Sequence, residues 1–188
     1  MKGLYMRVVL CITGASGVIY GIRALEELER VGVETHLVVS RIARDVIKQE
    51  TSYTIQELMN LASYCYDESD LTASINSGSF KFDCCVVIPC SMKTLSGIAH
   101  GYADNTITRV ADVTLKERRN LVIVPRETPL RTTHLENMAK LSREGAVILP
   151  AMPAFYHSPE SVDEQVNFIV GKLFDILGIE NDLFRKWK

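Results

Sequence analysis

The chain has 188 residues, of which 47% are hydrophobic and 23% are charged, and its net charge is −2. A chain of this length buries roughly 70% of its unfolded surface, so we expect one globular domain over residues 1–188. The near-neutral charge gives no reason to expect nucleic acid or an anionic membrane as a partner. No apolar run approaches the roughly 20 residues of a membrane helix, and no signal peptide is indicated.

The cysteine pattern indicates the compartment. The five cysteines are an odd number, and none of them forms a Cys-x-x-Cys pair. This usage favours reduced, buried cysteines, so we expect a cytoplasmic protein.

Apolar runs alternate with segments of helical periodicity along the chain. Strands that alternate with helices predict an α/β fold, a Rossmann-like or flavodoxin-like open parallel sheet with helices on both faces. The expected strands are 7–13, 34–39, 84–88, 121–124 and 146–149. The expected helices are 18–31, 42–50, 92–101, 105–118, 133–143 and 160–177. The remaining long stretch, 64–82, is predicted to be irregular and could serve as an active-site loop or a contact arm.

The turn after the first strand is the first candidate binding site. Residues 13–17 read Thr-Gly-Ala-Ser-Gly, and small residues there let backbone N–H groups approach a phosphate at a helix N-terminus. A tight turn that simply needs glycine explains the pattern nearly as well. The motif differs from the dinucleotide pattern, and Ser40 stands where a ribose-binding acid would be expected. A mononucleotide such as FMN therefore suits the turn better than a dinucleotide.

Two further strands end at polar side chains. The strand 84–88 leads into Pro-Cys-Ser-Met-Lys-Thr-Leu at 89–95, and the strand 121–124 leads through Pro125 to Arg126 and Glu127. Ligands of open α/β sheets bind at the carboxyl ends of the strands. An arginine there can clamp a phosphate, and a neighbouring glutamate can move a proton.

Other candidates have structural explanations of similar or greater weight. Arg109, Asp112 and Lys116 share one face of the helix 105–118, which a solvated surface would also explain. The histidines occupy strand or helix-capping positions without a cysteine cluster, so no metal site is expected. Lys172 could be merely solvated, and Trp187 lies in a short basic tail, 179–188, where subunit contacts are expected.

In combination these segments resemble the UbiX family of flavin prenyltransferases, whose members have also been labelled phenylacrylic (aromatic) acid decarboxylase subunits. The resemblance runs from about residue 7 to residue 187. The matching segments are residues 13–17, Ser40, Glu50-Thr51, 89–95, 109–113, 115–118, 124–127, 134–138 and 153–156.

The resemblance implies an FMN-binding enzyme that transfers a dimethylallyl group from dimethylallyl phosphate to N5 and C6 of reduced FMN, without a metal. The prenylated FMN would serve a UbiD-type decarboxylase. The residues implied to bind FMN are Gly14, Ala15, Ser16, Ser40, Ser91, Met92, Lys93, Thr94 and Arg126. Those implied to bind dimethylallyl phosphate are Tyr156 and Lys172, with Arg109 and Lys116.

The implied catalytic residues are Ser16 near flavin N5, Glu50 and Glu127 for proton transfer, and Lys116. Some family members carry arginine at the position of Lys172 and an aromatic residue at that of Leu71. The resemblance also implies large homo-oligomers, such as a dodecamer, in which neighbouring subunits complete each site. We expect Trp187 and the 64–82 loop to make such contacts.

Three alternatives remain at the level of the sequence. The first is an FMN-dependent decarboxylase acting directly on phenolic acids. The second is a decarboxylase of the peptidyl-cysteine type, which would need an early catalytic histidine that the turn 13–17 lacks. The third is a flavin carrier without catalysis, which would not need Glu50, Lys116 and Glu127 together.

Overall fold

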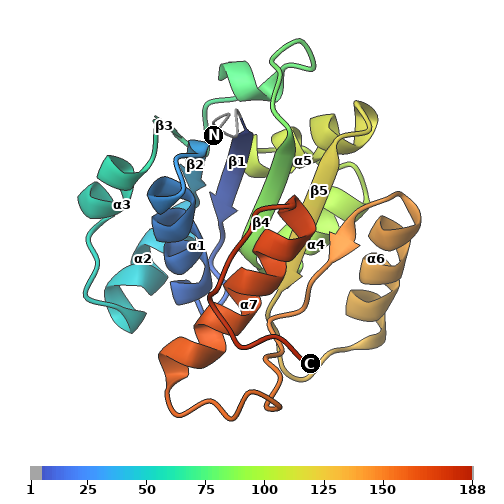
Figure 1. Ribbon diagram of the computed structural model, residues 1–188. Helices are drawn as coiled ribbons and strands as arrows, with labels where there is room; N and C mark the ends of the chain where they lie inside the picture. Colours follow the sequence, from blue (N-terminus) through green and yellow to red (C-terminus); the bar gives the residue numbers. More distant parts are fainter. Residues whose placement is uncertain (1–5, 188) are drawn as a thin grey trace.

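A parallel sheet forms the centre of the computed structural model, which describes residues 6–187 (Figure 1). Its strand order is β3-β2-β1-β4-β5-β6, and all neighbouring strands run parallel. The strands are β1 (Arg7–Ile12), β2 (Glu34–Val39), β3 (Tyr64–Tyr66), β4 (Cys84–Cys90), β5 (Asn120–Pro125) and β6 (Val147–Ile148). The chain winds outward from β1 to β3, crosses to β4, and winds outward again. This confirms the predicted open α/β sheet, and the strand order is that of Rossmann folds.

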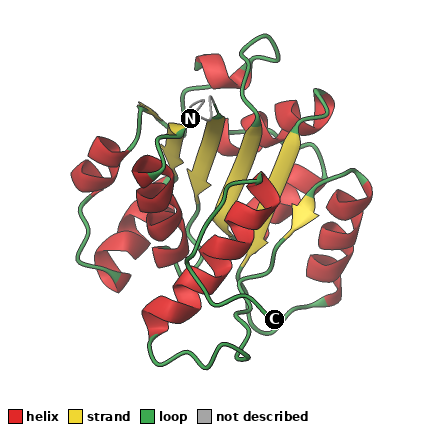
Figure 2. Cartoon of the chain, in the orientation of Figure 1, coloured by secondary structure: helices red, strands yellow, loops and turns green. Residues whose placement is uncertain are grey.

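Helices cover both faces of the sheet (Figure 2). They are α1 (Ile19–Arg30), α2 (Arg41–Glu50), α3 (Ile55–Leu61), α4 (Met92–Ala99), α5 (Thr106–Lys116), α6 (Thr132–Arg143) and α7 (Val162–Leu177). Alternate residues of β1 divide the core between the two faces. Val8 and Leu10 join one hydrophobic cluster with α1 and α7, whereas Val9 and Cys11 join the other with α4 and α5. Burial on both faces explains why the strands are continuous apolar runs.

The predicted elements match the observed ones except between β2 and β4. The stretch 64–82, predicted to be irregular, contains the edge strand β3 and a short 3₁₀ turn, Ser74–Asn76, and the helix α3 precedes it. The sheet therefore has one strand more than predicted. In addition, β4 continues through Pro89 to Cys90, two residues beyond its predicted end.

Four of the five cysteines are buried in the core, as predicted, but Cys65 in β3 is exposed. Burial raises the pKa values of the Cys84 and Cys90 thiols far above their ordinary range. These two thiols are therefore protonated near neutral pH, and they pack as small apolar side chains. Among residues 6–187, no helix is both long and apolar enough to cross a membrane.

Candidate functional site

The carboxyl ends of β1 and β4 meet where the chain changes its winding direction. Thr13, buried just after β1, donates its hydroxyl to the carbonyl of Pro89 (2.7 Å) and accepts from the backbone N–H of Ser91 (2.8 Å). The threonine side chain thus fixes the turn 13–17 beside the start of α4. Ligands of open α/β sheets bind at such a switch point. Thr13 was not among the predicted site residues, although it belongs to the motif.

Glu50 closes the N-terminus of α1. Its carboxylate accepts hydrogen bonds from the backbone N–H groups of Gly17 (2.8 Å) and Val18 (3.3 Å). The turn 13–17 was predicted to present backbone N–H groups to a phosphate, and in the structure a carboxylate from the end of α2 accepts from the last N–H of that turn and from the next residue. The arrangement places the exposed Glu50 one residue from Ser16, where a proton-transfer group was predicted.

Glycine at position 14 permits a close approach of two elements. A Cβ atom there would lie 2.4 Å from Cγ2 of Ile42, in the first turn of α2. Contacts below 3.0 Å do not occur for real Cβ atoms, so any side chain would push α2 away from the turn. Gly14 therefore keeps Ser40 and the start of α2 close to the turn.

Two serines cap helices at the same carboxyl end of the sheet. The Ser40 hydroxyl accepts from the backbone N–H of Ala43 (3.1 Å) and caps α2. Ser91 caps α4 by accepting from the N–H of Thr94 (3.4 Å), and its hydroxyl also donates to the Thr94 hydroxyl (3.1 Å). Thr94 is buried, so within this subunit it supports Ser91. Hydroxyl groups at helix N-termini favour an anionic ligand.

Arg126 lies beside the turn, and its buried Nε has no hydrogen-bond partner within the described part of the chain, residues 6–187. Its Cγ would lie 3.9 Å from a Cβ placed at Gly17, whose φ is +93°. Burial raises the pKa of the nearby Tyr20, and the charge of Arg126 opposes that rise. A buried guanidinium nitrogen with no partner is costly, so it marks a position where an anion would be stabilised.

A polar groove of about 490 Å³ extends from this edge between α2 and α4. Its lining residues are Val39, Arg41, Arg44, Asp67, Glu68, Ser69, Lys93, Asp104 and Asn105. Arg44 is a candidate that the sequence analysis missed, and its Nε is also buried without a partner. Its spacing of four from Ser40 on α2 is the signal that would have indicated it. The backbone N–H of Arg41 donates to the Glu68 carboxylate (2.7 Å).

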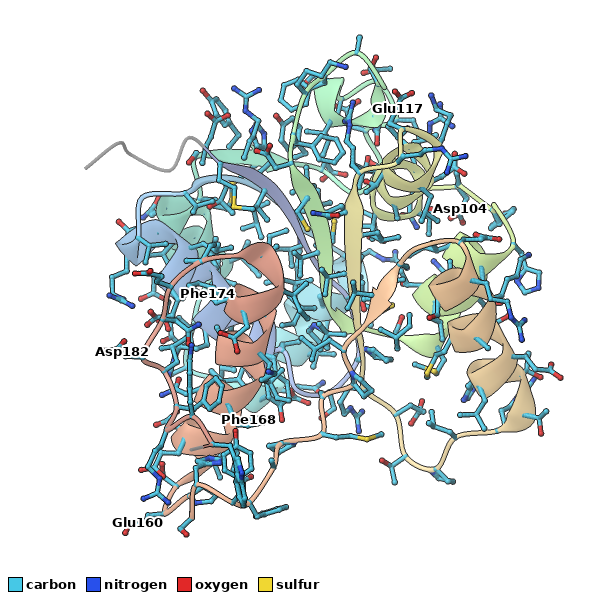
Figure 3. All side chains as sticks on the ribbon, turned by 45° about the vertical axis from the view of Figure 1, so that its right-hand side comes forward. Asp104, Glu117, Glu160, Phe168, Phe174 and Asp182 are labelled. Atoms are coloured by element: carbon cyan, nitrogen blue, oxygen red, sulfur yellow. The ribbon has the colours of Figure 1, made fainter. Side chains whose placement is uncertain are left out.

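The predicted phosphate-binding residues come from different elements: Arg109 and Lys116 lie on α5, Lys172 lies on α7, and Tyr156 precedes α7. Arg109, one turn into α5 from the groove, pairs with Asp112 (3.3 Å). Lys116 ends α5 and pairs with Glu117, which Figure 3 places at the opposite end of the sheet from Phe168. β5, whose six residues span about 20 Å, separates Lys116 from Arg126. One subunit therefore does not bring Lys116 to the turn.

Lys172 lies on α7, and Tyr156 lies in the segment that precedes this helix. The Tyr156 ring packs against Phe168 with centroids 5.9 Å apart, and Lys172 pairs with Asp175 (3.3 Å). Glu127 follows Arg126 and accepts from the backbone N–H of Thr128 (2.9 Å). Within residues 6–187, no group of three or more histidine, cysteine, aspartate or glutamate side chains is placed to hold a metal.

The sequence matches a family model described as Flavoprotein over residues 3–174. The chain is 58% identical over 187 residues to a flavin prenyltransferase UbiX of Methanothermobacter thermautotrophicus, covering 100% of this chain and 97% of that protein. It is 51% identical to a UbiX of Methanocaldococcus jannaschii, with coverage of 97% and 98%.

Solved structures show the same likeness. A UbiX (PadA1) in complex with FMN and dimethylallyl pyrophosphate superposes with a TM-score of 0.96 at 45% identity, covering 98% of each chain. A dodecameric FMN-dependent UbiX-like decarboxylase from Escherichia coli O157:H7 gives 0.96 at 48% identity, covering 97% of this chain and 100% of that one. The peptidyl-cysteine decarboxylase EpiD, at 20% identity and a TM-score of 0.63, shares the fold.

Proposed function

The chain belongs to the UbiX family of flavin prenyltransferases, and from this premise we propose that it joins a dimethylallyl group from dimethylallyl phosphate to reduced FMN. The observation that carries the proposal is the buried, unpartnered Nε of Arg126 beside the turn 13–17. A flavin phosphate supplies the anion that this nitrogen lacks, and Ser40 and Ser91 offer hydroxyls at the same carboxyl end of the sheet. No carboxylate ends β2 to select a second ribose.

FMN would be held at the carboxyl edge of the sheet by three short segments and Arg126. The segments are the turn 14–16, Ser40 at the start of α2, and residues 91–94 at the start of α4. Bound FMN, in its reduced form, supplies the nucleophilic N5 and C6 atoms. We assign Ser16 to the surroundings of N5 by its resemblance to the family motif, and its exposed side chain is free to contact a ligand.

The prenyl donor would be activated by cations. A C–O bond of dimethylallyl phosphate breaks as the bond to N5 forms, and negative charge grows on the departing phosphate. Fixed cations and hydroxyls stabilise that charge, a role we assign to Arg109, Lys116, Lys172 and Tyr156. N5 would release its proton when it bonds to the prenyl group. For the second bond, a proton would add to one carbon of the prenyl C=C, the other carbon would bond to C6, and C6 would lose its proton. Glu50 and Glu127 are the carboxylates that we assign to these proton transfers.

A neighbouring subunit would complete each site. Lys116 lies at the opposite end of the sheet from Arg126, so both can serve one flavin only if they come from different copies of the chain. The dodecameric relative supports a large homo-oligomer. Further along the reaction sequence, we propose that the prenylated FMN passes to a UbiD-type decarboxylase in the cytoplasm.

Mass analysis of the flavin tests the proposal directly. The pure protein is incubated anaerobically with reduced FMN and dimethylallyl phosphate, and the extracted flavin should gain the mass of one prenyl unit. Dimethylallyl pyrophosphate is assayed in parallel, because the similar UbiX structure contains that compound. If neither donor changes the flavin mass while FMN binds, the proposed activity is wrong.

A second candidate function is direct decarboxylation of aromatic acids. Two similar structures are described as decarboxylases: the Escherichia coli protein, and a phenylacrylic acid decarboxylase from Aquifex aeolicus at 47% identity. The pure protein with oxidised or reduced FMN is incubated with a phenolic acid, and carbon dioxide is measured. Release of carbon dioxide without a partner enzyme would favour this function over prenyl transfer.

A further inference from the structure

The C-terminal segment, residues 179–187, folds back along one face of α7, and we name it the C-terminal strap. The backbone N–H of Ile179 donates to the carbonyl of Phe174 (2.9 Å) and reverses the chain. The Phe184 ring then packs on Phe168 with centroids 4.9 Å apart. At its end, the Trp187 ring meets Tyr156 edge to face at 5.1 Å. The strap therefore reaches a residue assigned to substrate binding.

The strap lies against α7 closely enough to require a glycine. A Cβ atom at Gly171 would come within 2.5 Å of Cδ1 of Phe184. The carbonyl of Gly171 also accepts from the Asn181 side-chain amide (3.3 Å). The C-terminal strap therefore packs against a surface of α7 that is complementary to it in shape.

Asp175 joins the strap to the cation Lys172. One carboxylate oxygen accepts from Nζ of Lys172 (3.3 Å), and the other accepts from Nζ of Lys186 (3.3 Å) and from the Asn181 amide (3.1 Å). Burial raises the pKa of Asp175, but these hydrogen bonds lower it below its ordinary value. The carboxylate is therefore charged near neutral pH and holds two ammonium groups at one point.

A pocket of about 330 Å³ lies under the end of the strap, lined by Tyr156, Arg185, Lys186 and Trp187. Two aromatic rings and two cations suit a ligand with an unsaturated hydrocarbon group and a phosphate. Three of these four residues belong to the strap, so the pocket exists only while the strap is seated.

We propose that Asp175 is a positioning residue that couples the seated strap to Lys172, so that the pocket wall and the phosphate-binding cations are set by one carboxylate. The inference rests on the proposed function through the roles of Tyr156 and Lys172. It predicts that loss of the carboxylate loosens the strap and weakens binding of the prenyl phosphate. FMN binding at the turn 13–17 should not change.

Trp187 reports the strap position, because it is the one tryptophan of the sequence. Asp175→Asn keeps the shape of the side chain and removes its charge. The Trp187 ring is 75% exposed even when the strap is seated, so its mobility rather than its accessibility reports the seating. We expect the fluorescence anisotropy of Trp187 to fall and KM for dimethylallyl phosphate to rise about threefold, as for loss of partly exposed ion pairs. The kcat should stay within about twofold, since Asp175 is not assigned a contact with the reacting atoms. Asp175→Glu should restore most of both effects.

Asp182→Asn is the matched control, because it removes an exposed carboxylate of the strap that has no ion pair with a lysine among residues 6–187. It should leave the Trp187 anisotropy and KM unchanged. An unchanged anisotropy or an unchanged KM in Asp175→Asn would overturn the proposal, and so would a lower KM or an equal loss of FMN affinity. If the wild-type protein transfers no prenyl group, the anisotropy and calorimetric titration with dimethylallyl phosphate still decide the strap, and the proposed function fails separately.

Discussion

Arg126 is the residue whose surroundings indicate a ligand most directly. Its guanidinium Nε is buried beside the turn 13–17 and has no hydrogen-bond partner among residues 6–187. We expect Arg126→Met to lower the affinity for FMN by about 10- to 100-fold, the loss of one hydrogen bond to a charged group. The thermal midpoint of the ligand-free protein should not fall and should rise slightly, because the substitution removes a buried donor that is costly without a partner. Isothermal titration with FMN and thermal denaturation measure the two quantities.

Arg143→Met provides the control for Arg126, because it removes an exposed arginine from the far end of α6. Its FMN affinity should equal that of the wild type. An Arg126→Met protein that binds FMN normally would place the flavin phosphate elsewhere, with Arg44 in the groove as the next candidate.

Thr13 stabilises the point where β1 meets β4. In Thr13→Val the backbone N–H of Ser91 loses its acceptor, while the side-chain shape stays nearly the same. Because Thr13 is buried, we expect the free energy of unfolding to fall by about 1–3 kcal/mol, the cost of an unsatisfied buried group. Urea denaturation measures the fall. Thr132→Val, at an exposed position of α6, should cost less than about 0.5 kcal/mol, and equal costs for the two variants would show that the Thr13 hydroxyl is unimportant.

At the scale of elements, strands and helices with long apolar patterns could be predicted from the sequence, whereas the short edge strand β3 could not. β1 and α2 were located within one residue, because burial on both faces of a strand or one face of a helix leaves a clear pattern. β3 has three residues, and Tyr64 and Cys65 are exposed, so no alternation distinguishes it from a loop. Its strand form depends on pairing with β2, which local sequence does not encode.

The candidate site followed from the same logic. Ser40, Ser91 and Arg126 come directly after buried strands, so the carboxyl edge was predictable from the chain order. The hydrogen bonds of Glu50 to the start of α1 were not, because they depend on how α2 packs against the turn. The distance of Lys116 from that edge also depends on the direction of α5 across the sheet.

The β2–β3 edge carries a buried histidine that makes stability depend on pH. His36 bonds to the Tyr66 hydroxyl (2.9 Å) and the Glu34 carboxylate (2.9 Å), which confirms its predicted structural role. Burial lowers the pKa of His36, and the bond and charge of Glu34 only partly oppose this. As pH falls below the unfolded value of about 6.5, the unfolded chain binds the proton first. Stability is therefore lost as pH falls towards the lower pKa of the folded state.

We expect the thermal midpoint of the wild type to fall between pH 7.5 and pH 5.5, and to fall less in His36→Gln. Glu34 remains charged over this range, because its bonds to His36 and Arg7 lower its pKa despite some burial. His100→Gln, which changes an exposed histidine at the end of α4, should keep the wild-type dependence. If the thermal midpoint of His36→Gln falls with pH as steeply as that of the wild type, a group other than His36 causes the pH dependence of stability.

At the scale of the whole molecule, the parallel sheet separates two sets of charged residues. Ser91 and Arg126 follow β4 and β5 at the carboxyl end of the sheet, whereas Lys116 ends α5 at the amino end of the strands. In every β-α-β unit the helix runs antiparallel to the strands that it connects. Rotation of side chains within one subunit therefore cannot bring the carboxyl end and the amino end of the sheet together. A reaction that needs both residues must therefore use more than one copy of the chain.

Mixed oligomers test this consequence. At FMN and dimethylallyl phosphate concentrations near the wild-type Kd values, Lys116→Met and Arg126→Met should each lose most prenyl transfer, the first by weakening phosphate binding and the second by weakening FMN binding. In oligomers formed from equal amounts of both variants, each shared site draws Lys116 from one chain and Arg126 from another. Random assembly then gives about one quarter of the sites both wild-type residues, so about a quarter of wild-type activity should return. If each subunit supplied both residues to its own site, every site would carry one substitution and no activity would return.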